Sequence, residues 1–252
     1  MKTLSRRKLI TTGLSAAAGF TGLAVASRLS SRYGLIPPDS AGFYGPGETL
    51  TYAAQRLLTT HSLAREFSRG SISTMPFANE VPPLGADFKL HQAAGFSEWR
   101  LTVDGMVARP LSLSLSDLRH LSVRSQITEV ACEEGWSYIA EWIGTPLIDV
   151  LLEAGILPQA RYLVYFSIDR DWWESIDMAD ALHPQTLLTW GMNNGDLPVP
   201  FGGPLRMRLP RQLGYKSLKY IHHLTATDSL KRFGQGLGSA EPEAGYSWFA
   251  GI

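Results

Sequence analysis

The sequence predicts a mixed, strand-rich α+β domain, and three observations support that prediction. Stretches with strand character recur from about residue 99 to residue 225. Helical spacing of apolar residues is confined to short stretches before and between them. The chain has no internal repeat with a period of roughly 20 to 50 residues, so a solenoid or propeller is not expected. With 252 residues, 44% of them hydrophobic, it can bury one sizeable core.

The domain is expected to occupy residues 49–252 and to follow an extended arm. Residues 27–48 are rich in proline, glycine and serine, which is typical of such an arm. The first helix is then predicted from Leu50 to about Arg65, because the apolar positions recur at helical spacing. Pro76, Pro82 and Pro83 make the next stretch irregular.

Strands account for most of the remaining predicted elements. Alternating or continuous apolar runs predict them at residues 99–107, 111–115, 126–132, 161–168, 173–178, 186–192, 204–209 and 218–225. A short helix is expected to begin at Asp117, and Asn194-Gly195 marks a turn. Thr145 and Pro146 predict the N-cap and first position of a helix that Gly155 ends. Cys132 is therefore expected between a strand and that helix.

The N-terminus has the features of an export signal. A basic stretch from Lys2 to Lys8 precedes an uncharged run over residues 9–27, and Ala24-Val25-Ala26 is a small-x-small cleavage pattern. Arg6-Arg7 is typical of a twin-arginine leader, which exports folded cargo. Glycine and threonine dilute the apolar run, which favours a signal peptide over residues 1–26 rather than a membrane anchor. The expected location is the periplasm.

The charge of the chain excludes a nucleic-acid function. The whole chain carries 23 basic and 23 acidic residues. Removal of the leader would leave 19 basic against 23 acidic residues, because four of the basic residues lie between Lys2 and Lys8. A chain with this balance has no basic footprint for DNA or RNA.

Cys132 is the only cysteine, which is unusual for an exported chain, because exported proteins that use cysteine structurally carry it in pairs. An internal disulfide is excluded. Two interpretations of the lone thiol remain from the residues alone: a small buried hydrophobe, or a functional group. The sequence contains no HExxH, GxSxG or glycine-rich phosphate loop that would assign another chemistry.

Five motifs occur in the order seen in a known family. They are Cys132-Glu-Glu-Gly-Trp-Ser137, Trp142-Ile-Gly-Thr-Pro-Leu147, Leu182-His-Pro-Gln-Thr-Leu-Leu188, Gly202-Gly-Pro-Leu-Arg206 and Leu213-Gly-Tyr-Lys-Ser-Leu-Lys219. Over roughly residues 60–228 the chain resembles the sulfite oxidase family of molybdopterin enzymes, especially its small exported bacterial members of the periplasmic methionine-sulfoxide reductase type. The resemblance implies a sulfite-oxidase-like molybdopterin-binding domain. The C-terminal immunoglobulin-like dimer domain of true sulfite oxidases is expected to be missing.

The resemblance also implies a cofactor, molybdopterin with molybdenum, and a set of residues that bind it. Cys132 is expected to be the one protein ligand of the metal, and a soft thiolate suits that role. The implied cofactor-binding residues are Phe67, Ser68, Arg69, Ser167, Phe201, Gly202, Arg206, Lys216, Ser217, Leu218 and Lys219. Among these, Arg206, Lys216 and Lys219 are expected to hold the phosphate. By strand alternation alone, Arg206 and Arg208 also fit a solvated basic edge. Phe201 departs from the family, where a polar residue bonds the pterin.

The function expected from the resemblance is oxygen-atom transfer to or from a small substrate or a side chain. Reduction of an S-oxide or N-oxide is favoured over sulfite oxidation, because Glu133 and Glu134 follow the thiol and would repel an anion. The chain has no haem or iron–sulfur motif, so a separate haem-linked or quinone-linked membrane protein is expected to supply electrons. The protein is expected to be a monomer.

Two alternative functions remain open. A non-catalytic exported binding module that retains the fold is favoured by Phe201. A thiol-dependent hydrolase is disfavoured, because no histidine lies near Cys132 in the sequence.

Overall fold

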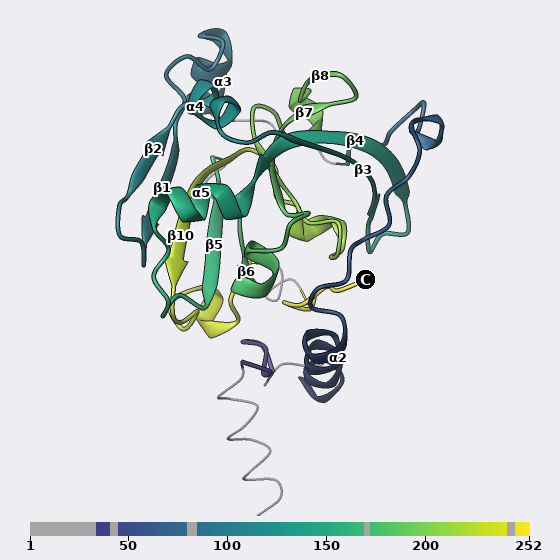
Figure 1. Ribbon diagram of the computed structural model, residues 1–252, viewed down its shortest axis with the longest axis vertical. Helices are drawn as coiled ribbons and strands as arrows, with labels where there is room; N and C mark the ends of the chain where they lie inside the picture. Colours follow the sequence, from purple (N-terminus) through teal and green to yellow (C-terminus); the bar gives the residue numbers. More distant parts are fainter. Residues whose placement is uncertain (1–33, 41–44, 80–84, 169–171, 241–244) are drawn as a thin grey trace, which may run out of the picture.

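The structure is a computed structural model that describes residues 34–40, 45–79, 85–168, 172–240 and 245–252 (Figure 1). The predicted leader, residues 1–26, lies outside the described residues, as do residues 27–33 and 41–44 of the predicted arm. Within the part of the chain that is described, no helix has the length and apolar character needed to cross a lipid bilayer.

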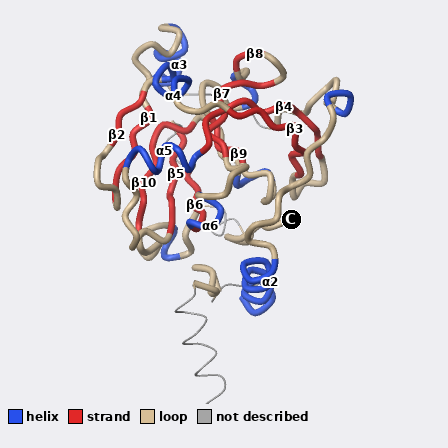
Figure 2. The backbone as a smooth tube through the Cα atoms, in the orientation of Figure 1, coloured by secondary structure: helices blue, strands red, loops and turns tan. Residues whose placement is uncertain are grey.

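The first sheet has five strands in the order β2-β1-β10-β5-β6 (Figures 1 and 2). The strands are β1 (Leu101–Gly105), β2 (Leu111–Leu113), β5 (Tyr162–Ser167), β6 (Trp173–Asp177) and β10 (Ile221–Thr227). β1 and β10 are parallel, and the other neighbours are antiparallel. The sheet therefore joins the first strand of the domain to the last.

The second sheet has the order β3-β4-β7-β8, and β9 pairs with β7. Its strands are β3 (Arg124–Ala131), β4 (Ser137–Pro146), β7 (Leu187–Met192), β8 (Gly195–Asp196) and β9 (Arg206–Arg208). β3 and β4 form a long antiparallel hairpin, with register from Arg124↔Gly144 to Ala131↔Ser137. The hairpin loop, residues 132–136, contains Cys132.

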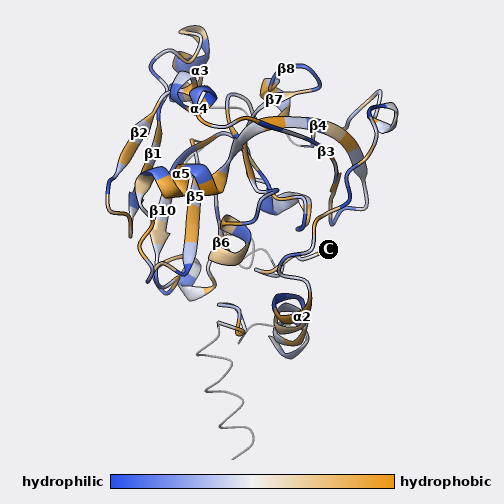
Figure 3. Cartoon of the chain, in the orientation of Figure 1, coloured by the Kyte–Doolittle hydropathy of each residue, from blue (hydrophilic) through white to orange (hydrophobic). Residues whose placement is uncertain are grey.

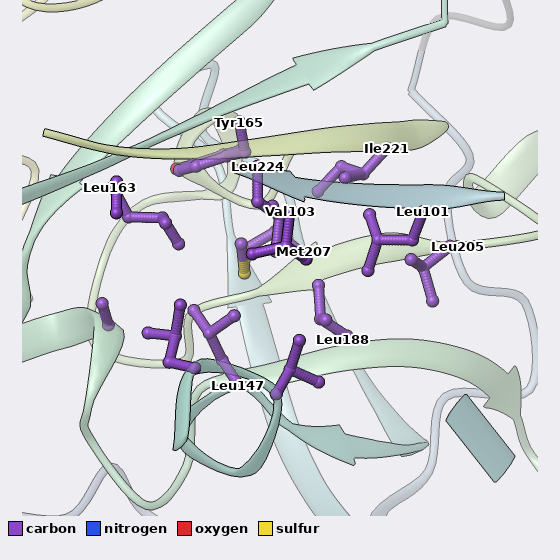
Figure 4. Close-up of a cluster of buried hydrophobic side chains, with 14 of the residues drawn as sticks. Leu101, Val103, Leu147, Leu163, Tyr165, Leu188, Leu205, Met207, Ile221 and Leu224 are labelled. Carbon is purple, nitrogen blue, oxygen red and sulfur yellow. The ribbon is translucent and has the colours of Figure 1, made fainter. Parts of the chain in front are cut away.

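The hydrophobic core lies where the two sheets meet helix α5 (Leu147–Ala154) (Figure 4). Leu101, Val103 and Leu224 come from the first sheet, whereas Leu188 and Met207 come from the second. All five are fully buried. Apolar residues are concentrated on α5 and β5, as Figure 3 shows, and burial of this surface stabilises the fold by about 25 cal/mol per Å².

Helix α2 (Gly45–Leu58) lies beside the sheets and is attached to them by polar groups. The Arg56 guanidinium forms ion pairs with Asp177 and Asp180 at 2.6 and 2.5 Å. The Tyr52 hydroxyl donates to Asp177 at 2.6 Å. The helix begins at Gly45, within residues 27–48 that were predicted to form the arm.

The C-terminal residues 245–252 pack against this N-terminal region. The backbone N–H of Trp248 donates to the Asp39 carboxylate at 2.8 Å. The N–H of Phe249 donates to Glu48 at 3.2 Å, and both aromatic rings contact Tyr52. Residues from the arm, from α2 and from the end of the chain thus form one buried cluster.

The remaining helices are short. They are α3 (Ala86–Ala93), α4 (Leu115–His120), α6 (Met178–Ala181) and single 3-10 turns at Arg69–Ser71, Val199–Phe201, Gly214–Lys216 and Gly234–Gly236. Ser114 and Asp117 form a capping box that begins α4, two residues before the predicted start. Gly155 ends α5 in the left-handed region at φ 66°, as a C-terminal glycine does.

One long strand, β4, was not predicted from the sequence. Cys132 was expected between a strand and a helix, but it lies in the loop of the β3–β4 hairpin. β4 is buried on both faces over most of its length, so its residues do not alternate between polar and apolar. Pro146, rather than Thr145, is the N-cap of α5, because β4 continues to Pro146 and α5 begins only at Leu147.

Candidate functional site

The hairpin loop holds Cys132 at the end of β3. Gly135 has φ 90°, a conformation that glycine adopts without strain, and its N–H donates to the Cys132 carbonyl at 3.1 Å. The Cys132 N–H donates to the Trp136 carbonyl at 3.0 Å. These two bonds close the loop tightly and leave the thiol partly exposed.

The thiol faces a cavity of about 380 Å³. The walls come from the hairpin, from residues 77–79, from the end of β5 and from residues 201–220. Seven residues predicted for the site line this cavity: Cys132, Ser167, Phe201, Arg206, Ser217, Leu218 and Lys219. The structure thus brings together residues from three of the five sequence motifs or their flanks, and Ser167 in addition, although they are far apart in the chain.

Two cationic side chains form part of the wall. Arg206 is only 4% exposed and donates to the carbonyls of Phe201 and Ser217, each at 2.7 Å. Its guanidinium lies 5.1 Å from the Trp142 ring centroid. Lys219 donates to the carbonyls of Pro200, at 2.9 Å, and Asn79. The alternative of a solvated basic edge is wrong, because Arg206 and Arg208 are both buried.

Lys216 does not line the cavity, which corrects its predicted role as a phosphate ligand. Its ammonium group donates to the Glu174 carboxylate at 2.5 Å, and both side chains are buried. The Tyr165 hydroxyl donates to the Lys216 carbonyl at 2.8 Å. A buried ammonium needs such a partner, because removing a charge from water costs several kcal/mol. Lys216 therefore stabilises the cavity wall through its bonds with Glu174 and Tyr165.

The predicted segment Phe67, Ser68 and Arg69 also lies outside the cavity lining. The Phe67 N–H donates to the Ile127 carbonyl on β3 at 2.9 Å. Arg69 forms an ion pair with Glu141 at 2.7 Å and bonds Asn194 at 2.9 Å. Arg69 therefore contacts the β3–β4 hairpin and does not line the cavity. Its predicted role in cofactor binding is corrected accordingly.

Gly202 supports the wall without lining it. It adopts φ 105°, and a Cβ placed there would lie 3.0 Å from the Lys219 side chain and 3.1 Å from Cβ of Arg206. A larger residue would push these two cationic side chains apart. The predicted contact of Gly202 with the cofactor is therefore replaced by an indirect role through Arg206 and Lys219.

Aromatic side chains form the rest of the cavity wall, and most of them were not predicted as site residues. Trp136 stacks on Tyr138 with ring centroids 6.0 Å apart, and the Phe77 ring meets its edge at 5.2 Å. Tyr215 and Tyr246 lie 5.5 Å apart on another side. The position of Trp136 four residues after the thiol was a usable signal. Phe77 and Tyr246 come from distant segments that only the fold brings together.

Two carboxylates lie beside the thiol. Cys132 Sγ is 3.3 Å from Glu133 Oε2 and 3.8 Å from Glu134 Oε2, and Trp136 Nε1 donates to Glu134 at 2.7 Å. Burial raises the pKa of the Cys132 thiol to about 12, and the neighbouring carboxylates add to the effect. A free thiol with this pKa is protonated at neutral pH and is a poor nucleophile. No histidine lines the described part of the cavity, which further disfavours a thiol hydrolase.

The donor set fits a metal that brings its other ligands with it. Over the described residues, no group of three or more His, Cys, Asp or Glu side chains is placed to hold a metal ion. One soft sulfur donor faces a cavity that also presents two cations to an anionic group. The site therefore offers one thiol and two cationic residues, which are the groups that an anionic cofactor carrying a thiophilic metal would need.

Comparison with known proteins identifies the family. The profile of the oxidoreductase molybdopterin binding domain matches residues 89–232, which is more than half of the chain. The chain belongs to this family. The predicted sulfite-oxidase-type relationship and the predicted cofactor, molybdopterin with molybdenum, are confirmed.

The chain is similar to proteins named as methionine-sulfoxide reductases. It is 39% identical over 155 residues to the putative protein-methionine-sulfoxide reductase subunit YedZ1 of Azospira oryzae, covering 62% of this chain and 56% of the relative. It is 34% identical over 140 residues to the protein-methionine-sulfoxide reductase catalytic subunit MsrP of Xanthomonas campestris, covering 50% and 44%. The chain thus spans about half the length of these curated relatives.

A solved structure supports the predicted fold class. The sulfane dehydrogenase SoxCD of Paracoccus pantotrophus superposes with a TM-score of 0.51 and 20% identity, covering 68% of this chain and 46% of that one. At this identity the likeness concerns the fold alone. The mixed α+β, sulfite-oxidase-like fold is confirmed, and the described residues include no separate immunoglobulin-like domain.

Proposed function

We propose that this protein reduces S-oxides, with the S-oxide of methionine side chains as the favoured substrate. The observation that carries the proposal is the single Cys132 thiol, which faces an aromatic-walled cavity with two carboxylates beside it. The names of the similar Azospira and Xanthomonas proteins point to the same substrate. The reaction consumes two electrons and two protons, converts the S-oxide to a thioether, and releases water.

Cys132 would hold the molybdenum, and Arg206 and Lys219 would hold the anionic part of the cofactor. When bound, the cofactor supplies oxygen-atom transfer coupled to a two-electron change. The chain itself binds and orients the substrate. Phe77 and Trp136 present apolar ring surface to a methyl thioether, and sulfur contacts with aromatic rings are favourable. Glu133 and Glu134 oppose the approach of sulfite, which is an anion.

We further propose that the electrons come from a separate membrane protein that carries haem or interacts with quinone. The sequence, with one cysteine and no CxxCH motif, has no place for a haem or iron–sulfur relay. The protein would act as a monomer in the periplasm. The twin-arginine pattern at Arg6-Arg7 supports that location, because this route exports proteins with cofactors already inserted.

The test is turnover with an artificial electron donor. Protein purified from a molybdenum-competent host should oxidise reduced viologen when a methionine S-oxide peptide is added. Sulfite oxidation by the same preparation, measured with an artificial acceptor, should be much slower. Fast sulfite oxidation without S-oxide reduction would reverse the proposed direction of oxygen transfer.

A further inference from the structure

Charge is distributed unevenly among the described residues that line the cavity. The two acidic residues, Glu133 and Glu134, flank the thiol in the hairpin loop, and both are exposed. The two cationic residues, Arg206 and Lys219, come from the wall formed by residues 201–220. A substrate that approaches the thiol from solvent therefore meets negative charge first.

The cationic groups are already engaged by the protein. Arg206 is 4% exposed and donates to backbone carbonyls, and Lys219 also donates to backbone carbonyls. None of these bonds is made with the exposed hairpin loop. Among the residues that the structure describes, neither Glu133 nor Glu134 forms an ion pair.

The two acids have different surroundings. Glu134 accepts the indole N–H of Trp136 at 2.7 Å, which fixes that ring as part of the cavity wall. Among the described residues, the Glu133 carboxylate has one hydrogen bond, which it accepts from the Cys132 thiol at 3.3 Å. Glu133 is therefore the acid that remains available to a bound ligand.

Exposed aromatic rings line the same cavity as this carboxylate and suit a positively charged ligand. Phe77, Trp172 and Tyr246 line the cavity, and they are 53%, 46% and 37% exposed. The face of an aromatic ring attracts an ammonium or guanidinium group, and a nearby carboxylate adds to that attraction. Together these groups have the chemistry that binds a lysine or arginine side chain.

We propose that Glu133 is a specificity-determining residue that selects S-oxide substrates flanked by basic residues over those flanked by acidic residues. The inference rests on the proposed S-oxide reduction and names its substrate class as methionine S-oxide in basic polypeptide segments. Opposite charges across a binding site mainly change substrate capture and selectivity, so the effect should appear in KM.

A neutral variant tests this role, and the same hairpin provides a matched control. Glu133→Gln removes the charge and keeps the side-chain shape. Glu129→Gln makes the same change at an exposed position of β3 that does not line the cavity. Both positions are exposed, so neither variant is expected to unfold the protein.

The first measurement is viologen-dependent reduction of methionine S-oxide peptides flanked by lysines, serines or glutamates. The wild type should prefer the lysine peptide over the glutamate peptide by about tenfold in kcat/KM at low salt. Glu133→Gln should reduce that preference by about threefold or more through KM, whereas Glu129→Gln should not. Equal kcat/KM values for the three peptides, or an unchanged preference in Glu133→Gln, would overturn the inference.

The second measurement does not depend on turnover. A lysine-flanked methionine sulfone peptide cannot be reduced as an S-oxide, so its Kd for the cofactor-loaded protein is obtained by calorimetry. Glu133→Gln should raise that Kd about threefold or more, and Glu129→Gln should leave it unchanged. If no peptide is reduced, the proposed function fails, and this Kd alone decides the inference. Equal Kd values in wild type and Glu133→Gln would overturn it.

Discussion

The ammonium group of Lys216 lies 2.5 Å from the carboxylate of Glu174, and neither side chain reaches solvent. Burial raises the pKa of Glu174, and the positive charge of Lys216 opposes that rise. The pair lies behind the cavity wall, where Lys216 ends the turn of residues 214–216 and Ser217 and Leu218 line the cavity. Lys216 has the residue type of a phosphate ligand, but its ion pair with Glu174 supports the cavity wall instead.

We expect Lys216→Met to lower the free energy of unfolding by about 3–5 kcal/mol, because it leaves Glu174 buried without its cation. Urea unfolding measures the change. The double variant Lys216→Met/Glu174→Leu should recover part of the loss, since it removes both charges. Arg109→Met is the control. It breaks an exposed pair with Glu153 and should cost less than about 1 kcal/mol. Normal stability of Lys216→Met would contradict the assignment.

Lys219→Met should reduce pterin occupancy severalfold with little change in the free energy of unfolding. The lysine lines the cavity and is the more exposed of the two cations there. A hydrogen bond to a charged group contributes about 1.5–3 kcal/mol, so the affinity for the pterin should fall by about tenfold or more and the occupancy should fall with it. Pterin fluorescence after denaturation measures occupancy. Lys231→Met, at an exposed position outside the cavity, serves as the control. Full occupancy in Lys219→Met would remove this residue from the site.

Ionisation of the buried Glu48 should lower the free energy of unfolding as the pH rises. Burial, and then the neighbouring Asp39, raise its pKa from the ordinary value of 4.5 to about 7. Between these values the folded state binds a proton that the unfolded state has lost. The stabilisation is therefore complete below pH 4.5 and is lost as the pH rises through 7.

The measurement is the Tm of wild type and Glu48→Gln between pH 5 and pH 8. The wild type should lose stability relative to the variant over this range, by on the order of 1–2 kcal/mol. The glutamine retains an oxygen that can accept the Phe249 N–H but does not ionise. Parallel Tm curves for the two proteins would show that Glu48 does not titrate in this range.

Much of the fold was predictable because local patterns coincide with the native elements. Leu163 to Tyr165 form a continuous apolar run in β5, and Gly155 ends α5 where a C-terminal glycine was predicted. β4 was missed because both of its faces are buried. Glu141 lies on one of these faces, and its carboxylate forms an ion pair with Arg69. An acidic residue in such a strand gives no alternation to detect.

The site could be predicted where a motif indicated both the residue type that the chemistry needs and its position in the chain. Cys132 and Arg206 were predicted because a thiol suits a metal and a guanidinium suits an anion. Both residues line the cavity. Lys216 has the same charge as Lys219, three residues later, and only the fold shows that one side chain points to Glu174 and the other to the cavity. Phe77 and Tyr246 carry no chemical signature in the sequence, so their place depended on tertiary structure.

The proposed export route predicts a dependence on the two adjacent arginines. Replacing Arg6 and Arg7 by lysine should leave the protein in the cytoplasm with its cofactor inserted, because the twin-arginine route reads this pair. Cell fractionation with immunoblotting measures the distribution. Equal periplasmic amounts of wild type and the double variant would contradict the proposed route.

Cys132→Ser tests the central claim most directly. Serine keeps the approximate size of the side chain but is a harder donor that does not readily lose its proton. The measurement is methionine S-oxide turnover per mole of bound pterin, with reduced viologen as donor, in wild type and variant. The account predicts turnover in the wild type and a folded, pterin-containing variant without turnover. Unchanged turnover in Cys132→Ser would contradict it, because the proposed reaction requires Cys132 as the ligand of the metal.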